Sequence, residues 1–308
     1  MQALERALET FDFRQGESLR VFHGRGQCYP GLGYINIDWF APVLLVTLYR
    51  QPEPGLPALL DKCLRALPES VQSILLQRRY VRGAPLEVLR GELPGEACAV
   101  EEGLRFSLSF GDKQNIGFFM DMAPGRRWLQ QRCEGRRVLN LFAYTCAFSV
   151  AAVAAGAHSV VNVDMSRAAL AVGRDNHRLN DQHRALERDV RFLPYDLFRS
   201  WKRVIGSGPY DIVIIDPPSL QKGSFVAAKD YGRVLRRLPE LLPEGGDILA
   251  CLNAPELGED FLHSRLSEHC EGADFVGRLP NRVDFPEADS SRNLKMLHFY
   301  LPPQSACR

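Results

Sequence analysis

The stretch from Tyr210 to Ser219 combines an apolar strand with polar groups at its end. Its sequence, YDIVIIDPPS, carries four consecutive apolar residues and then Asp216, Pro217, Pro218 and Ser219. Because prolines keep their carbonyl oxygens but have no N–H, Asp216 and the Pro217 carbonyl form two neighbouring hydrogen-bond acceptors. They can hold an exocyclic amine by its hydrogens and direct its lone pair at an electrophilic methyl group. The alternative is a structural turn after a core strand.

A second candidate site lies upstream, where the sequence VLNLFAYTCAFS at 138–149 indicates a strand, a turn and the start of a helix. Asp164 ends the next predicted strand, 21 residues after Ala143. An acidic side chain at that position can accept hydrogen bonds from both hydroxyl groups of a ribose. The alternative role for Asp164 is to cap the helix predicted over Arg167–Asn180.

The turn from Ala143 to Phe148 contains no glycine. Dinucleotide-binding turns need glycine so that the backbone can approach the pyrophosphate, and this argues against NAD and FAD. S-adenosylmethionine carries a ribose and an adenine but no phosphate, so a turn lined by small residues such as Thr145 and Ala147 can suffice for it. Asp196, after the third predicted strand, can accept from the adenine amino group or serve as an ordinary turn aspartate.

The elements that must position these residues follow an α/β pattern from Gly111 onward. Strands alternating with helices predict a Rossmann-like, mostly parallel sheet with its site at the carboxyl ends of the strands. The two closing strands have a short link and should pair antiparallel. Residues 1–110 instead predict a small α+β domain with the order strand, strand, helix, strand, strand. We therefore expect one domain at 1–110 and a second at 111–308.

Strands and helices are predicted in both domains. In the first domain they are strands at 33–40 and 43–49, a helix at 56–67, and strands at 73–81 and 104–110. In the second domain the strands are at 137–142, 159–164, 190–194, 210–216, 247–252, 275–279 and 295–301. The helices of the second domain are at 149–155, 167–180, 231–242 and 258–270.

Composition bounds the function further. The 308 residues carry a net charge of +1, with 45% hydrophobic and 24% charged residues, as in an ordinary soluble globular protein. This neutral balance restricts any nucleic-acid site to a local patch.

The cysteines form no C-x-x-C pair, so we expect no metal site. The uncharged run Val138–Val163 is long enough to span a bilayer, but its polar residues and Gly156 favour strand, helix and strand instead. Without a secretory signal, a cytoplasmic protein is expected.

Several short motifs are spread along the chain. They are NLFAYT at 140–145 with Phe148, NVD at 162–164, DN at 175–176 with Asn180, YDLF at 195–198, DPPS at 216–219, DY at 230–231 and EGG at 244–246. Together they resemble the bacterial S-adenosylmethionine-dependent 23S ribosomal RNA base methyltransferases. The stretch NIGFFMD at 115–121 is similar to the family's lead-in, whose aspartate faces the cofactor. The resemblance covers residues 30–305.

The resemblance implies a class I methyltransferase domain preceded by a small β–α–β domain. It implies S-adenosyl-L-methionine as cofactor, and ribosomal RNA or a ribosome assembly intermediate as partner. It gives the catalytic role to Asp216, Pro217, Pro218, Ser219 and Tyr231, with Tyr231 stacking on a base drawn out of its helix. The cofactor-binding residues that it implies are Asp121, Asn140, Phe142, Ala143, Tyr144, Thr145, Asp164, Met165, Tyr195, Asp196 and Asp216.

One departure from the family bears on the atom that is methylated. Members that methylate C5 of cytosine carry a nucleophilic cysteine just past the fifth strand, and this chain has Asn253 there. Cys251 lies two residues earlier, where a buried small side chain is the commoner interpretation. We therefore expect methylation at a nitrogen.

Two basic runs, at 126–137 and 78–82, can hold phosphates or form solvated helical faces. They and the separate small domain favour RNA as substrate. Two alternatives remain open at this point. The first is methylation of a small molecule or a protein side-chain amide, since Asp-Pro-Pro motifs hold any planar amine. The second is a noncatalytic module that only binds S-adenosylmethionine.

Overall fold

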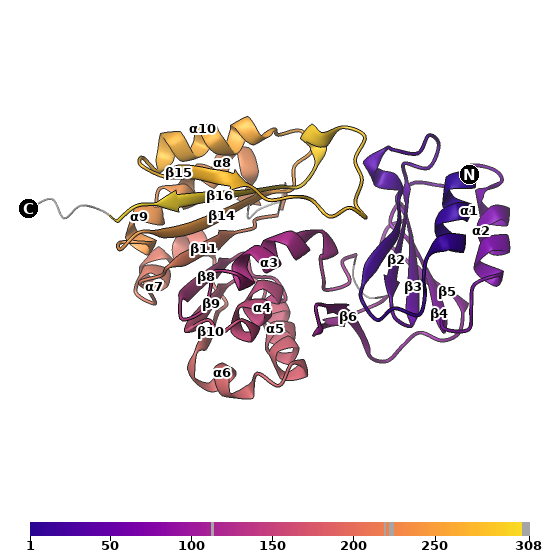
Figure 1. The fold of residues 1–308 in the computed structure, drawn as a ribbon, viewed down its shortest axis with the longest axis horizontal. Helices are drawn as coiled ribbons and strands as arrows, with labels where there is room; N and C mark the ends of the chain where they lie inside the picture. The colour runs from indigo at the N-terminus through magenta and orange to yellow at the C-terminus, as the bar shows by residue number, and fades with distance from the viewer. Residues whose placement is uncertain (112–113, 219, 222–224, 304–308) are drawn as a thin grey trace, which may run out of the picture. The chain divides into compact units, whose positions relative to one another are not determined.

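The computed structural model describes residues 1–111, 114–218, 220–221 and 225–303, and the chain divides into two compact units (Figure 1). Unit 1 comprises Met1–Met120 and Arg282–Ser290, and unit 2 comprises Asp121–Asn281 and Ser291–Arg308. The sequence placed the division between residues 110 and 111. It gave no sign that a segment late in the chain lies with the first unit.

Unit 1 is built on a five-stranded sheet of order β1-β2-β3-β4-β5. Its strands are β1 (Leu19–His23), β2 (Ile35–Phe40), β3 (Val43–Leu48), β4 (Ser73–Arg78) and β5 (Leu86–Arg90). Strands β3 and β4 run parallel, joined by helix α2 (Leu56–Arg65), and the other neighbours pair antiparallel. Tyr49 and Arg79 therefore leave the sheet at the same edge, because Leu48 and Arg78 are in register.

Helices α1 (Gln2–Thr10) and α2 cover one face of this sheet (Figure 1). Leucines spaced for one helical face enter the core from both of them. They are Leu4 and Leu8 on α1 and Leu56, Leu60 and Leu64 on α2.

The sequence prediction for unit 1 missed α1, the short strand β1 and the edge strand β5. It assigned the last strand of the sheet to 104–110, but β7 (Leu104–Leu108) pairs with β6 (Ala97–Glu101) in a separate hairpin. Strand β5 escaped notice because its side chains are mostly exposed and show no alternation of buried and polar residues.

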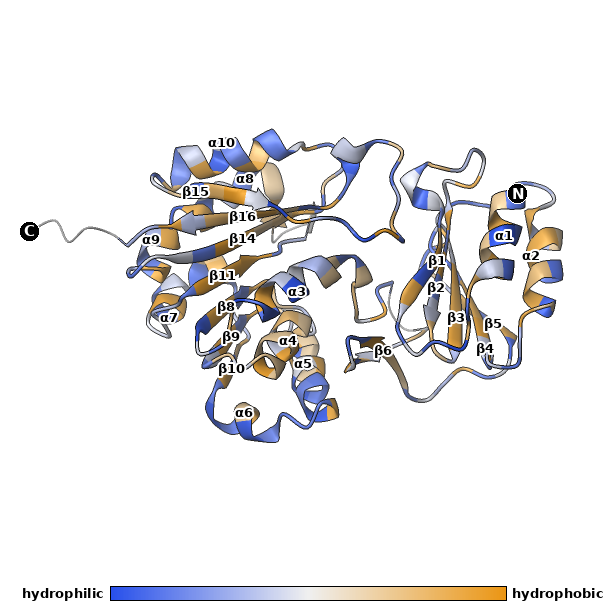
Figure 2. Ribbon diagram, in the orientation of Figure 1, coloured by the Kyte–Doolittle hydropathy of each residue, from blue (hydrophilic) through white to orange (hydrophobic). Residues whose placement is uncertain are grey.

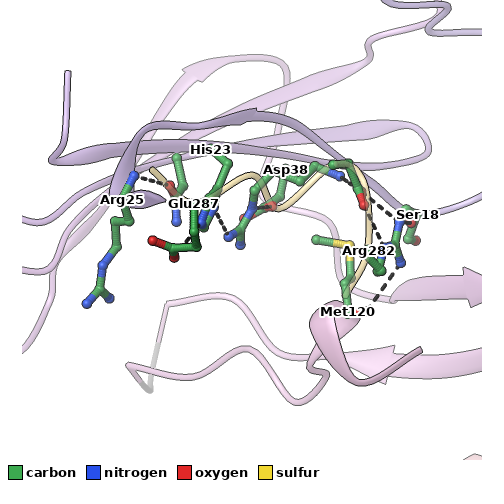
Figure 3. Close-up of polar contacts among 10 residues, drawn as sticks. Ser18, His23, Arg25, Asp38, Met120, Arg282 and Glu287 are labelled. Carbon is green, nitrogen blue, oxygen red and sulfur yellow. Dashed lines mark hydrogen bonds and ion pairs between the residues drawn. The ribbon is translucent and has the colours of Figure 1, made fainter. Parts of the chain in front are cut away.

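Residues 282–290 return to unit 1 and bind its first strands, as Figure 3 shows. Asp284 accepts from the Arg20 backbone N–H at 2.9 Å, and the Ala288 N–H donates to the Gly26 carbonyl at 2.7 Å. Glycine is required at position 26, since a Cβ there would lie 1.8 Å from the Pro286 carbonyl oxygen. We call residues 282–290 the return segment.

Unit 2 contains a seven-stranded sheet of order β10-β9-β8-β11-β14-β16-β15. Its strands are β8 (Arg137–Leu141), β9 (Ser159–Val163), β10 (Val190–Leu193), β11 (Ile212–Ile215), β14 (Gly246–Leu252), β15 (Asp274–Arg278) and β16 (Lys295–Leu301). Strand β16 pairs antiparallel with both β14 and β15, while the pairs among β10, β9, β8, β11 and β14 are parallel. Central strands such as β11 are continuously apolar because helices cover both faces of the sheet.

The helices of unit 2 divide between the two faces. Helices α3 (Ala123–Gln130) and α4 (Ala147–Ala154) share one apolar cluster with alternate residues of the strands. Helices α7 (Trp201–Ile205), α8 (Ala227–Leu235), α9 (Leu238–Leu241) and α10 (Glu259–His269) contribute to the cluster on the other face. Figure 2 shows the contrast between the mainly hydrophobic α4 and the mainly hydrophilic α6 (His183–Arg188).

The predicted fold class is confirmed, including the antiparallel strand at the end of a mostly parallel sheet. The helix predicted over 231–242 is two helices, α8 and α9, because Pro239 lacks the N–H that would continue the hydrogen-bond ladder. Within the described ranges, no helix has the length and hydrophobicity to span a membrane. The uncharged run 138–163 folds as β8, α4 and β9.

Candidate functional site

The carboxyl ends of the parallel strands bring the predicted site residues to one edge of the sheet. Leu141 is in register with Val163 on β9 and with Ile215 on β11. The residues that follow these three positions are Phe142, Asp164 and Asp216, so they leave the sheet at the same level. The separate predictions for Asp164 and Asp216 thus fall on neighbouring segments of a single edge.

The loop after β8 has a strained backbone. Phe142, Tyr144 and Cys146 have φ values of 58°, 48° and 61°, in the left-handed region that glycine adopts most easily. Each such residue costs about 1–2 kcal/mol relative to ordinary backbone. The sequence lacks the glycines of a nucleotide-binding turn, but the loop still uses the backbone conformation that glycine usually supplies.

Three contacts hold this loop in place. Asp164 Oδ2 accepts from the Tyr144 N–H at 2.8 Å, and Asn176 on α5 (Arg167–Leu179) donates from Nδ2 to the Thr145 carbonyl at 2.9 Å. The side chain of Cys146 fits against Gly173, where an added Cβ would lie 2.5 Å from the Cys146 sulfur. The loop conformation is therefore fixed by tertiary contacts.

Asp164 does not cap the following helix. Its Oδ1 accepts from the Ser166 N–H at 2.8 Å, and Ser166 itself caps α5 by accepting from the Ala169 N–H at 3.1 Å. The Asp164 carboxylate thus accepts from the backbone of the loop after β8 and of the loop after β9. The apolar side chain of Met165, which comes next in the sequence, is 52% exposed.

A series of buried, hydrogen-bonded side chains links β8 and β9 to helices α4 and α5 beside the loop. Asn140 donates to Asn162 at 2.9 Å, Asn162 donates to Ser149 at 2.9 Å, and Ser149 lies 3.0 Å from His177 Nε2. His177 Nδ1 is 2.5 Å from Gln182 Oε1, whose amide nitrogen donates to the Val150 carbonyl. Burial lowers the pKa of His177 to about 4. The ring is therefore neutral at pH 7, with Ser149 donating to Nε2 and Nδ1 donating to Gln182.

These hydrogen bonds change the interpretation of Asn140, which the resemblance assigns to cofactor binding. Its side chain is buried and its amide nitrogen is used by Asn162. Among the described residues, no donor reaches Asn140 Oδ1. Asn140 therefore supports β8 and β9 from within the sheet.

Asp216 lies half-buried after β11, followed by the buried Pro217 and the half-buried Pro218. Burial raises the pKa of Asp216 to about 7, the nearby Asp121 carboxylate adds to the rise, and Arg126 opposes it. Among the described residues no hydrogen bond to the Asp216 carboxylate is found. Ser219, predicted to be catalytic, lies outside the described residues.

Tyr231 stands in a different place from the one expected of a base-stacking residue. It is fully buried on α8, and its hydroxyl donates to the Cys251 carbonyl at 3.0 Å, with the Ile215 carbonyl 3.4 Å away. No face of its ring is open to a base. Instead, the Tyr231 hydroxyl links β14 to the last residue of β11, Ile215, which immediately precedes Asp216.

Asp196 acts as a turn residue, the alternative left open by the sequence. Its Oδ1 accepts from the Phe198 N–H at 2.9 Å and caps the short helix at Leu197–Arg199, and its Oδ2 lies 3.3 Å from Arg199. Tyr195 is half-buried, with the guanidinium of Arg203 4.9 Å from its ring centroid.

The basic run at 126–137 does not form one phosphate-binding face. Arg136 is 2.6 Å from Asp247 and Arg137 is 2.7 Å from Asp211, at the amino ends of the strands and away from the loops described above. Arg126 is only 2% exposed, lies 6.0 Å from the Phe148 ring and acts on the pKa of Asp216.

A family model described as S-adenosylmethionine-dependent methyltransferase matches residues 19–300. The chain belongs to this methyltransferase family. A ribosomal RNA large subunit methyltransferase from Deinococcus radiodurans is 33% identical over 268 residues, 83% of this chain and 64% of that protein. Ribosomal RNA large subunit methyltransferase I from Aeromonas hydrophila is 28% identical over 230 residues, 71% of this chain and 57% of that protein. The chain spans less than two thirds of the length of these relatives.

The crystal structure of SMU.776 complexed with SAH aligns with a TM-score of 0.83 at 24% identity, covering 97% of this chain and 80% of that one. This similarity shows the fold. The predicted family, with S-adenosylmethionine as its cofactor, is confirmed by the match of the family model.

The sequence did not single out several residues that shape this methyltransferase site. The sequence puts Arg126 in a run of possible phosphate-binding residues, marks neither Gly173 nor Gln182, and includes Asn162 only within a short motif. The one usable signal was Asn176, whose motif lies on α5 at a helical position facing the loop after β8.

Proposed function

We propose that this methyltransferase transfers a methyl group from S-adenosylmethionine to a nitrogen of a base in 23S ribosomal RNA, either free or within a ribosome assembly intermediate. The observation that carries the proposal is Asp216, a carboxyl group at the registered end of β11 whose pKa burial raises to about 7. Relatives named as ribosomal RNA large subunit methyltransferases support the substrate class. Such a substrate places the activity in the cytoplasm.

The residues around the loop after β8 fit the cofactor. Each Asp164 oxygen accepts one backbone N–H, and because a carboxylate oxygen has two lone-pair sites, one site on each remains for a ribose hydroxyl. Met165 offers an exposed apolar surface for the adenine. Tyr144 and Thr145 belong to this loop, whose Tyr144 N–H is bound by Asp164. S-adenosylmethionine bound there supplies an activated methyl group.

Asp216 would perform two tasks. In its ionised form it accepts a hydrogen bond from the target amine, together with the Pro217 carbonyl, and so orients the nitrogen lone pair. After methylation the nitrogen carries an extra proton. A carboxylate with a pKa of about 7 is a competent acceptor for that proton near neutral pH. Pro218 follows without an N–H, so it places no competing donor beside the carboxylate.

Cys251 supports nitrogen as the target atom. Methylation at C5 of cytosine needs a thiolate that attacks the base. The Cys251 side chain is fully buried, and burial together with the neighbouring Asp216 raises the pKa of its thiol well above the usual value. The position after β14 where the nucleophile of C5 enzymes is expected holds Asn253, which is exposed.

The proposal is tested by methyl transfer from radiolabelled S-adenosylmethionine to total ribosomal RNA, purified from a strain that lacks this gene and from its parent. We expect label in the large-subunit RNA of the deletion strain and none in that of the parent, where the site is already methylated. Mass spectrometry of the digested nucleosides should show an N-methylated base. Cofactor binding without transfer to RNA would contradict the substrate, and 5-methylcytosine would contradict the nitrogen assignment.

A further inference from the structure

One edge of the unit 1 sheet gathers arginine and tyrosine side chains from four segments. Arg25 follows β1, Tyr34 precedes β2, Tyr49 follows β3 and Arg79 follows β4. The register places them together, since Ile35 pairs with Leu48, Leu48 with Arg78, and His23 with Asn36. We call these four residues the arginine–tyrosine edge. All of them lie within unit 1.

Two arginines of this edge share one aromatic ring. The Arg25 guanidinium carbon lies 4.3 Å from the centroid of the Tyr49 ring, and that of Arg79 lies 5.5 Å from the same centroid. Stacking on an aromatic ring orients a planar guanidinium but does not neutralise its charge. Two positive charges are thus held near each other in fixed orientations.

The hydrogen-bond partners of Arg79 are all neutral. It donates to the Gln77 side-chain oxygen at 3.1 Å, to the Asn115 side-chain oxygen at 3.1 Å, and to the Gln114 carbonyl. Among the described residues, no carboxylate forms an ion pair with Arg79 or Arg25. Figure 3 shows the exposed Arg25 side chain extending away from the cluster of Asp38 and Arg282.

Several other arginines of unit 1 form ion pairs, whereas Arg90 donates to backbone carbonyls. Arg20 is 2.7 Å from Asp38, Arg50 is 2.7 Å from Glu53, and Arg78 pairs with Glu87. Arg50 is the nearest comparison, because it also stacks on a tyrosine of this edge, at 4.5 Å from the Tyr34 centroid. Arg25 and Arg79 therefore present two positive charges that no carboxylate among the described residues pairs with.

An exposed aromatic residue follows Arg79 in the sequence. Tyr80, next to Arg79, is 38% exposed, and Val81 beside it is 40% exposed. Oriented guanidinium groups bind phosphate in bidentate fashion, and a neighbouring ring can stack on an unpaired base. An acidic peptide would satisfy the cations but would leave the aromatic surface without a planar partner.

We infer that the arginine–tyrosine edge binds the backbone of single-stranded RNA, with Arg25 and Arg79 on phosphates and Tyr80 against a base. The inference accords with the proposed RNA substrate, but it concerns binding by unit 1 and needs no methyl transfer. The two can therefore fail separately.

The test measures fluorescence anisotropy of a labelled single-stranded RNA of mixed sequence, titrated with the full-length chain. Each phosphate contact to a single strand contributes about 0.7 to the slope of log affinity against log salt, which is about fivefold in affinity at 0.1 M salt. Arg25→Ala should therefore lose about fivefold, and the double variant with Arg79→Ala about 25-fold, with a slope smaller by about 1.4. Arg25→Lys should keep the slope.

Arg50→Ala is the matched control, because it removes a stacked arginine whose charge Glu53 already balances. It should change RNA affinity less than twofold. Arg79→Ala also removes the contacts of Arg79 with residues 114–115, so Arg25→Ala alone is the decisive variant. Thermal melting checks that each variant is folded. Wild-type affinity in Arg25→Ala would overturn the inference. So would an equal loss in Arg50→Ala, or tighter binding of polyglutamate than of RNA by the wild type.

Methyl-transfer assays separate this result from the proposed function. If RNA binding falls in Arg25→Ala while the wild type methylates no RNA, the edge is an RNA site and the proposed reaction is wrong. If the wild type methylates RNA and both variants bind RNA normally, the reaction stands and the edge has no part in it.

Discussion

Aspartate side chains at the two ends of the unit 2 sheet have opposite environments: Asp247 and Asp211 are ion-paired at the amino end, and Asp216 at the carboxyl end has no hydrogen-bond partner among the described residues. At the amino end, Asp247 accepts from Arg136 and lies 2.6 Å from His298, and Asp211 binds both the backbone and the guanidinium of Arg137. At the carboxyl end, Asp216 has a raised pKa and the loop after β8 holds left-handed residues.

This difference separates stability from function within a single sheet. Paired charges at the amino end stabilise the fold, whereas uncompensated charge and backbone strain at the carboxyl end lower stability and leave groups available to ligands. Substitutions at the two ends should therefore have opposite consequences. At the carboxyl end they should impair activity more than stability, and at the amino end the reverse.

The largest effect is expected for Asp216→Ala. Removing a preorganised polar group at the reacting centre should lower the methyl-transfer rate by about a hundredfold or more, while affinity for S-adenosylmethionine stays within about tenfold. Single-turnover rates at saturating cofactor and RNA, with calorimetry for the cofactor, measure both. A wild-type rate would remove Asp216 from the mechanism.

Asp216→Asn sharpens this test through pH and stability. With a pKa of about 7, the wild-type carboxylate is lost as the pH falls, so the rate should rise with pH through about 7. The asparagine variant should lack that dependence. Because burial disfavours the charged form in the folded state, the variant should also unfold at a higher temperature at pH 8. An asparagine variant that transfers methyl groups more slowly and also unfolds at a lower temperature would contradict the contrast between the two ends of the sheet.

Asp164→Ala should weaken cofactor binding by about 1–3 kcal/mol, because hydrogen bonds from two ribose hydroxyls to a charged acceptor are lost. The loop after β8 also loses its contact at the Tyr144 N–H. Ser166→Ala is the matched control, since it removes the cap of α5 and leaves the carboxylate in place. Unchanged cofactor affinity in a folded Asp164→Ala would contradict the cofactor assignment.

Asp247→Asn tests the amino end. Burial alone would raise the pKa of Asp247, but hydrogen bonds from His298 and Arg136 lower it overall. The ion pair therefore stabilises the fold above the usual aspartate range and ceases to do so as the pH falls below it. We expect a loss of about 1–3 kcal/mol in unfolding free energy at pH 7 with little change in rate. Denaturation curves at pH 7 and pH 3 check this, and an inactive, fully stable variant would contradict it.

For the strained loop after β8 we expect the second of two substitutions to offset the loss of stability caused by the first. Gly173→Ala alone should destabilise by about 1–3 kcal/mol, because its Cβ would overlap Cys146. Cys146→Gly relieves the left-handed strain and frees that space, so the double variant should regain most of the stability that Gly173→Ala loses. Additive effects in a double-mutant cycle would show that the two sites are independent.

Cys251→Ser should have the smallest effect. No covalent bond to the base is needed for transfer to nitrogen, so we expect the rate to stay within about threefold, after allowance for any loss of stability at this buried position. Loss of turnover in a folded variant that still binds cofactor and RNA would restore cytosine C5 chemistry.

Position along the chain was enough to predict that Asp164 and Asp216 lie at the same edge of the sheet, because each ends an apolar run and parallel strands end at a common edge. The roles of Tyr231 and Asn140 depend on which residues of other elements reach them, and local periodicity does not encode that. The left-handed loop was hidden for the same reason. Tertiary contacts from Asn176 and Gly173 impose it on a sequence with no glycine.

The return segment has a consequence for synthesis on the ribosome. Strand β1 and Gly26 of unit 1 are synthesised well before Asp284 and Ala288, which bind them from the other side of unit 2 in the sequence. Residues Asp121–Asn281 of unit 2 must be synthesised before these contacts within unit 1 can form. A truncated product that ends at Met120 would expose the backbone groups that the return segment covers, and proteases could therefore distinguish finished chains from unfinished ones.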